Sequence, residues 1–82
     1  MKDDIKIDRE IDITGEVCPY TFVKTKLALE TLSPGEVLKV ILDHQPASEN
    51  VPRSLQGEGN EIIDVSKVND TDWQIIARKR AE

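Results

Sequence analysis

The sequence is poor in the residues on which several functional classes depend. It has 82 residues with one cysteine, one histidine, and one each of Trp, Tyr and Phe. One cysteine cannot form an intramolecular disulfide, and with one histidine it falls short of the roughly four ligands of a structural zinc site. So few aromatic side chains also disfavour single-stranded RNA binding, which relies on base stacking. We expect no metal and no cofactor.

Two further absences concern membranes and polyanions. No apolar run is long enough to span a bilayer, and the first six residues lack the apolar stretch of a signal peptide, so we expect a cytoplasmic protein without membrane insertion. The net charge of −5 gives an averaged field that repels phosphates, so no direct nucleic-acid partner is expected. A chain of this length is predicted to form one domain over residues 1–82, with residues 1–8 as a loose N-terminal extension.

Alternation and apolar runs predict four strands. Isoleucines alternate with charged residues over Ile5–Ile13, whose second half at least is predicted to be a strand. The nearly continuous apolar run within Glu36–Asp43 is typical of a central strand. Glu61–Val68 and Trp73–Arg78 are rich in β-branched residues and flank the polar Asn69–Asp72 segment, which predicts an antiparallel hairpin.

A first helix is predicted from Pro19 to about Leu32. Proline suits the first turn of a helix because the missing N–H has no intrahelical partner there. Ser33-Pro34-Gly35 cannot continue a helix and ends it. Cys18 is therefore predicted to lie at a helix N-terminus.

A second, shorter helix is predicted to begin after a turn over His44–Ala47. Ser48 or Asn50 is its expected N-cap, and Pro52 is expected within its first turn. The two glycines after Gln56 end it.

The order of elements is βαβαββ, which predicts an α+β fold. We expect a two-layer sandwich, with a four-stranded mixed sheet and both helices on one face, because two short helices cannot cover both faces. If the first two strands are parallel, their carboxyl ends meet at one edge of the sheet, beside the N-termini of both helices.

Cys18 is either a small buried apolar residue or a reactive thiol. Its place between a glycine-containing loop and a helix start favours the second interpretation, since a helix N-terminus lowers a cysteine pKa from about 8.5 to roughly 3.5–7.5. His44 follows the second strand at the same edge and is either a proton-transfer partner or a solvated loop residue. Asp43 either caps the second helix or hydrogen-bonds to loop backbone.

The first helix carries two apolar stripes, of which one faces the sheet. One stripe consists of Phe22, Leu29 and Leu32, and the other of Tyr20, Val23 and Leu27. The second stripe is either part of a wide buried face or an exposed docking surface for another protein beside Cys18.

Four segments together resemble the TusA/SirA-type sulfur-carrier family between Ile11 and Arg78. They are Gly15-Glu16-Val17-Cys18-Pro19, Lys24-Thr25-Lys26-Leu27-Ala28-Leu29, Ser33-Pro34-Gly35-Glu36 and Gly59-Asn60-Glu61. The family usually has Cys-Pro-x-Pro, where this chain has Thr21 in place of the second proline. After the second strand the usual Asp-Asp-Pro is replaced by Asp43-His44-Gln45-Pro46.

The resemblance implies a βαβαββ carrier in which Cys18 accepts sulfane sulfur as a persulfide and passes it to an acceptor protein. The donor in such families is a cysteine desulfurase, a rhodanese-type enzyme or thiosulfate. Pro19, Thr21, Asp43 and His44 are the expected supporting residues. The alternatives are a protein-binding regulatory module in which Cys18 is incidental, and an RNA-binding domain by analogy with a translation initiation factor of similar fold.

Overall fold

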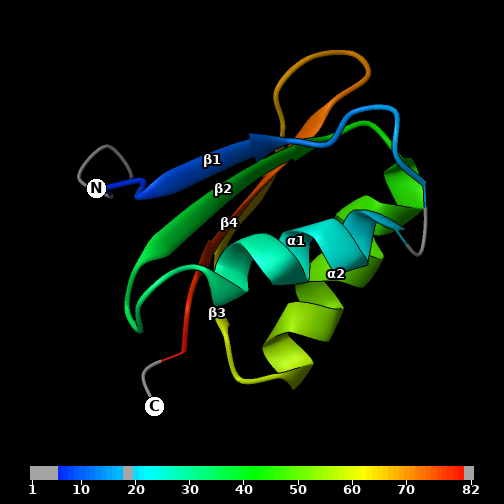
Figure 1. Ribbon diagram of the computed structural model, residues 1–82. Helices are drawn as coiled ribbons and strands as arrows, with labels where there is room; N and C mark the ends of the chain where they lie inside the picture. Colours follow the sequence, from blue (N-terminus) through cyan, green and yellow to red (C-terminus); the bar gives the residue numbers. More distant parts are fainter. Residues whose placement is uncertain (1–5, 18–19, 81–82) are drawn as a thin grey trace.

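The computed structural model describes residues 6–17 and 20–80 of the chain. Its elements are β1 (Arg9–Asp12), α1 (Tyr20–Glu30), β2 (Val37–Leu42), α2 (Gln45–Gly57), β3 (Glu61–Lys67) and β4 (Trp73–Arg78). The sheet has the order β1-β2-β4-β3, with β1 parallel to β2 and the other pairs antiparallel. Both helices lie on one face of this sheet (Figure 1). The predicted α+β sandwich with a mixed sheet is confirmed.

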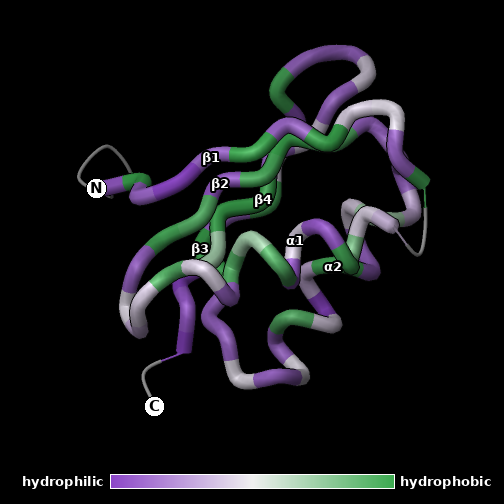
Figure 2. The backbone as a smooth tube through the Cα atoms, in the orientation of Figure 1, coloured by the Kyte–Doolittle hydropathy of each residue, from purple (hydrophilic) through white to green (hydrophobic). Residues whose placement is uncertain are grey.

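The core lies between the sheet and the two helices. Because side chains alternate along a strand, every second residue of the central strands points toward the helices. The fully buried core residues are Leu38, Val40, Leu42, Ala47, Leu55, Ile75 and Ala77. Figure 2 shows the hydrophobic colour concentrated along the central strands, while most of the loop that joins β3 to β4 is hydrophilic. Burial of each large side chain stabilises the fold by about 1.5–3 kcal/mol.

Strand β1 is shorter than the alternating pattern indicates, and it includes the charged residues Arg9 and Glu10. It lies at the edge of the sheet, where charged side chains have access to water. The Arg9 guanidinium donates a hydrogen bond to the Thr31 hydroxyl at 3.0 Å, just beyond the end of α1. Pairing of Ile11 with Val40 turns the apolar side of β1 toward the core.

The predicted start of the second helix is wrong. Neither the turn over His44–Ala47 nor an N-cap at Ser48 or Asn50 is found, because α2 begins at Gln45. Pro46 occupies its first turn, where a proline costs no hydrogen bond. The Ser48 hydroxyl donates to the Gln45 carbonyl at 2.6 Å, inside the first turns of the helix instead of before them.

Pro52 lies inside α2, contrary to the prediction that it belongs to the first turn. An interior proline removes one hydrogen bond and costs about 3 kcal/mol. Pro52 is buried, and its neighbours Val51 and Leu55 are almost fully enclosed by the core. Burial of this face offsets the cost, so tertiary packing overrides the local preference. No helix formed by the described residues is long and apolar enough to cross a membrane.

Candidate functional site

The ends of two parallel strands and the beginnings of both helices meet at one edge of the sheet. Strand β1 ends at Asp12 and β2 ends at Leu42, while α1 begins at Tyr20 and α2 at Gln45. Figure 1 shows these four ends on the same side of the molecule. The connection from β1 to α1 therefore runs along the edge where the sequence analysis places the candidate site.

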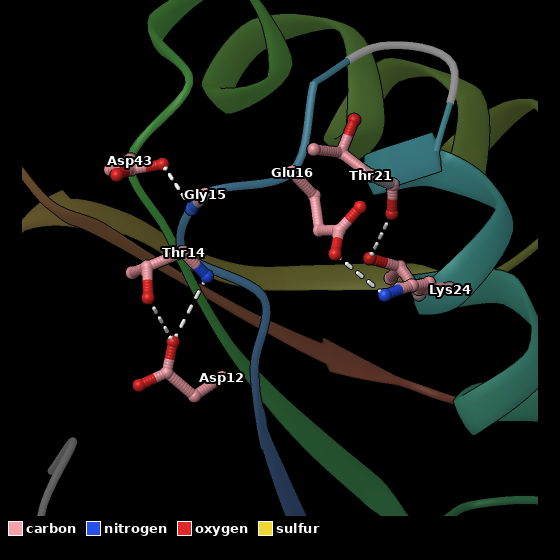
Figure 3. A network of polar contacts seen from close by, with 8 residues as sticks. Asp12, Thr14, Gly15, Glu16, Thr21, Lys24 and Asp43 are labelled. Carbon is pink, nitrogen blue, oxygen red and sulfur yellow. Dashed lines mark hydrogen bonds and ion pairs between the residues drawn. The ribbon is translucent and has the colours of Figure 1, made fainter.

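Two carboxylates hold the first part of this connection, which we call the 14–17 loop (Figure 3). Asp12 Oδ1 accepts hydrogen bonds from the Thr14 backbone N–H at 3.0 Å and from the Thr14 hydroxyl at 2.8 Å. Asp43 Oδ1, at the end of β2, accepts the Gly15 N–H at 2.9 Å. Gly15 has a φ of +91°, in the left-handed region that favours glycine.

Asp12 is an exposed carboxylate whose charged form is favoured by these contacts. The backbone hydrogen bond from Thr14, followed by the one from its hydroxyl, holds the pKa of the Asp12 carboxyl below its ordinary value. Hydrogen bonds to a carboxylate stabilise its ionised form, and the small desolvation of Asp12 opposes them without reversing the shift.

An ion pair between helix and loop holds the next residue. Lys24 Nζ lies 2.7 Å from Glu16 Oε2, so the second turn of α1 is joined to the 14–17 loop (Figure 3). The Glu16 N–H also donates to the Ile13 carbonyl at 3.1 Å. Thr14, Gly15 and Glu16 are therefore each bonded to a charged side chain, and the three partners come from three different parts of the fold.

Val17 joins the 14–17 loop to the helix. Its carbonyl accepts the Tyr20 N–H at 2.8 Å and the Thr21 N–H at 3.3 Å. Cys18 and Pro19, the site residues predicted from the sequence, lie between these bonded residues in the chain and outside the described residues.

The residues after β2 differ in what they contribute. Asp43 does not cap α2; it binds the Gly15 N–H, which is the other role expected for it. His44 is the N-cap residue of α2, but its side chain makes no capping hydrogen bond. His44 is partly exposed at the same edge, and its ring has no hydrogen-bond or ion-pair partner among the residues that the structure describes.

One face of α1 is apolar and exposed. Tyr20, Val23 and Leu27 are 59%, 45% and 57% exposed. The opposite side packs on the core through Ala28 and Leu29. The stripe formed by Tyr20, Val23 and Leu27, which we call the α1 stripe, is thus at the surface and begins two residues after Cys18.

The buried side of α1 contains two threonines that apolar periodicity does not reveal. Thr21 and Thr25 are fully buried, and the Thr25 hydroxyl donates to the Thr21 carbonyl at 2.7 Å. This bond satisfies the buried hydroxyl of Thr25 within the helix. Thr21, expected only to support the first turn, is therefore also a core residue, and the small buried side chains allow α1 to lie close to its neighbours.

Reasoning from sequence does not identify the contact between Lys24 and Glu16, because a lysine on a helix face is more often solvated than part of a site. The sequence shows only that Glu16 lies eight positions before Lys24. The start of the helix lies between them, and the direction of the chain there cannot be read from the sequence. Asp12 had a clearer signal, since an Asp two residues before a Thr at the end of a strand is typical of an Asx turn. Within the described ranges, no three His, Cys, Asp or Glu side chains are arranged to hold a metal ion.

Two of the hollows formed by the described residues lie beside the helices. One, of about 370 Å³, lies between β1 and α1 and includes Lys24 and Leu27. Another, of about 390 Å³, lies at the C-terminal ends of the helices, away from the 14–17 loop. There Arg80 Nη1 donates to the Glu58 carbonyl at 3.0 Å, so this cation stabilises a helix end by hydrogen bonding to its carbonyl.

Comparison with known proteins identifies the family. The family model described as "Sulfurtransferase TusA" matches residues 9–79. A protein of Archaeoglobus fulgidus named "Putative sulfur carrier protein" is 49% identical over 76 residues, which covers 93% of this chain and 86% of that protein. The Escherichia coli K12 protein named "Putative sulfur carrier protein TsuB" is 30% identical and covers 87% of this chain and 95% of its own length.

The solved structures agree on the fold. A SirA-like protein from Desulfitobacterium hafniense superposes with a TM-score of 0.78 over 89% of this chain and 99% of that chain, at 23% sequence identity. This similarity concerns the fold alone, whereas the match to the family model and the identity to the archaeal relative extend over nearly the whole sequence. The chain therefore belongs to the TusA sulfurtransferase family of sulfur carriers.

Proposed function

We propose that the protein accepts a sulfane sulfur atom on Cys18 as a persulfide and passes it to a partner protein. The observation that carries the proposal is the bonding of Val17 to both Tyr20 and Thr21, which joins an anchored loop to the start of α1 on either side of Cys18. A thiolate near a helix N-terminus is stabilised by backbone N–H groups and by the helix dipole. Membership of a sulfur-carrier family and the single cysteine of the chain support the same assignment.

The transfer is an exchange of one sulfur atom between thiolates. The Cys18 thiolate attacks the outer sulfur of a persulfide on the donor, a new S–S bond forms on Cys18, and the S–S bond of the donor breaks. The donor leaves as a thiolate and takes up a proton, which comes from water directly or through His44. An acceptor thiolate then attacks the outer sulfur on Cys18 in the same way, so the cycle needs no external oxidant, reductant or second cysteine.

The donor is a cysteine desulfurase, a rhodanese-type enzyme or thiosulfate, and the acceptor is another protein. With thiosulfate as the donor, the leaving group is sulfite. His44, which lies at the same edge with a partly exposed ring, is proposed to exchange protons with the departing thiolate. Pro19 and Thr21 are proposed to support the helix start that follows the thiol.

The α1 stripe is the proposed docking surface for these partners. Tyr20, Val23 and Leu27 expose apolar area on a small acidic protein, beginning two residues after Cys18. An apolar stripe beside a reactive group allows a partner to exclude water from the reacting sulfur atoms while it binds.

The test is direct detection of the sulfur adduct. Reduced protein is incubated with a cysteine desulfurase plus cysteine, and separately with thiosulfate plus a rhodanese, and intact mass is recorded for the wild type and Cys18→Ala. We expect a gain of about 32 Da that reductant removes and that the variant lacks. No adduct from either donor, with Cys18 accessible to alkylation, would contradict the proposal and favour a regulatory module that binds through the α1 stripe.

A further inference from the structure

The 14–17 loop is held in a different way from the other loop at this edge. In the loop before β4, the Asn69 side chain accepts the N–H groups of Thr71 and Asp72, so that loop is held by its own residues. The 14–17 loop has local bonds between Asp12 and Thr14 and is in addition bonded to side chains of other elements, as Asp43 is 28 residues away from Gly15. Local bonds give a loop its shape, whereas bonds to distant elements also set its place and direction relative to the body of the domain.

Two such long-range contacts act on consecutive residues. Asp43, at the end of β2, holds Gly15, and Lys24, in the second turn of α1, holds Glu16 at 2.7 Å. The Lys24–Glu16 ion pair is exposed, and exposed ion pairs contribute little to stability, whereas the Gly15 N–H bonds to a charged acceptor, which makes a stronger hydrogen bond than a neutral one. Loss of either contact should therefore leave the domain folded while it frees one residue of the 14–17 loop to move.

We propose that Asp43 and Lys24 are positioning residues for Cys18: they hold the 14–17 loop, from which the chain continues to Cys18, and this favours transfer from a persulfide on a docked partner. The inference rests on the proposed function. Transfer between two docked proteins requires the attacking sulfur to lie in line with the S–S bond that breaks, and a misplacement of about 1 Å can reduce such a rate about 100-fold. A small donor diffuses freely and finds the thiol from any accessible direction.

The rate of transfer from a protein donor can therefore be compared with the rate of loading by a small donor. A variant that only damaged the fold would slow both reactions. We expect Asp43→Ala to slow single-turnover transfer from a cysteine desulfurase persulfide about tenfold or more, while loading by inorganic polysulfide and alkylation by iodoacetamide stay within about twofold of wild type. Asp43→Asn keeps the acceptor oxygen and should recover most of the rate. Asp70→Ala, in the other loop, is the matched control, and thermal unfolding checks that every variant is folded.

Lys24 lies beside the α1 stripe and could contact the partner directly. The experiment on Lys24 must therefore separate such a contact from positioning of the 14–17 loop. If Lys24 acts through Glu16, then Lys24→Gln, Glu16→Gln and the double variant slow transfer by the same factor. Lys26→Gln is the matched control, since Lys26 lies on the same helix and forms an exposed ion pair with Glu58 at 3.2 Å, away from the loop.

Several outcomes would overturn the inference. Transfer rates of Lys24→Gln and Asp43→Ala equal to those of their controls would exclude positioning. Equal slowing of polysulfide loading would show that the variants change the chemistry of the thiol instead. A normal rate for Glu16→Gln would mean that Lys24 contacts the partner directly. Failure of the wild type to take sulfur from any donor would refute the proposed function itself, which is a separate result.

Discussion

Gly15→Ala tests whether the backbone of the 14–17 loop requires glycine. Gly15 has a φ of +91°, and a Cβ placed there would meet no atom within 4 Å. Any loss of stability would therefore come from backbone strain and not from a steric clash. Gly57 is the control, because it has the same free space around an added Cβ but no positive φ.

The expected effects have opposite signs. An L side chain in left-handed backbone costs roughly 1–2 kcal/mol, and the lower entropy of the unfolded chain returns about 0.4–1 kcal/mol of that cost. Gly15→Ala should therefore lower the free energy of unfolding by about 1 kcal/mol. Gly57→Ala, near the end of α2, should raise it by about 0.5–1 kcal/mol.

Thermal unfolding followed by circular dichroism can resolve this difference. For a domain of this size 1 kcal/mol corresponds to roughly 4–8 °C, so the Tm of the two variants should differ by about 10 °C. A Gly15→Ala variant that melts at or above the wild-type temperature would refute the reasoning. Gly15→Ala should also slow transfer from a protein donor, since a backbone shift that relieves the strain at residue 15 would move its N–H away from Asp43.

Three further predictions concern the core, the acid range and the α1 stripe. Leu38→Ala, at a fully buried position in β2, should lower the free energy of unfolding by about 2–5 kcal/mol in urea titrations; a loss below about 1 kcal/mol would contradict this packing. The lowered pKa of Asp12 means that its carboxylate stabilises the fold above the pKa of the unfolded chain, and this contribution disappears as the pH falls through the folded value. An ordinary pKa for Asp12 in a carbon-13 NMR titration would exclude the bonds from Thr14. Leu27→Glu should change stability by less than about 0.5 kcal/mol yet weaken transfer from a protein donor, and unchanged transfer would place docking elsewhere.

Most of the fold follows from local patterns. The run within Val37–Leu42 and the hairpin of β3 and β4 have the apolar and β-branched residues that strands need, and the predicted bounds agree within a residue or two. The predicted start of α2 is wrong because a proline such as Pro52 is expected in the first turn of a helix. Pro52 is buried inside the helix, so its packing in the core outweighs the local preference of proline for the first turn.

Some features of the candidate site are likewise predicted by local sequence, and others depend on the fold. The sequence placed a single thiol after a glycine-containing loop and before a helix, and it named Asp43 as a residue that hydrogen-bonds loop backbone or caps a helix. Which of these two roles Asp43 performs depends on how close the end of β2 comes to Gly15, which is set by the parallel pairing of β1 with β2.

The order of elements, the helix breaks and the position of the single cysteine follow from local sequence, because they depend on residues that are neighbours in the chain. The bonds of Lys24 to Glu16 and of Asp43 to Gly15, and the exposure of the α1 stripe, depend instead on how the whole chain folds. Such contacts join residues up to 28 positions apart. They arise from strand pairing and from the rotation of a helix on the sheet, which packing of the whole core sets and no local pattern encodes.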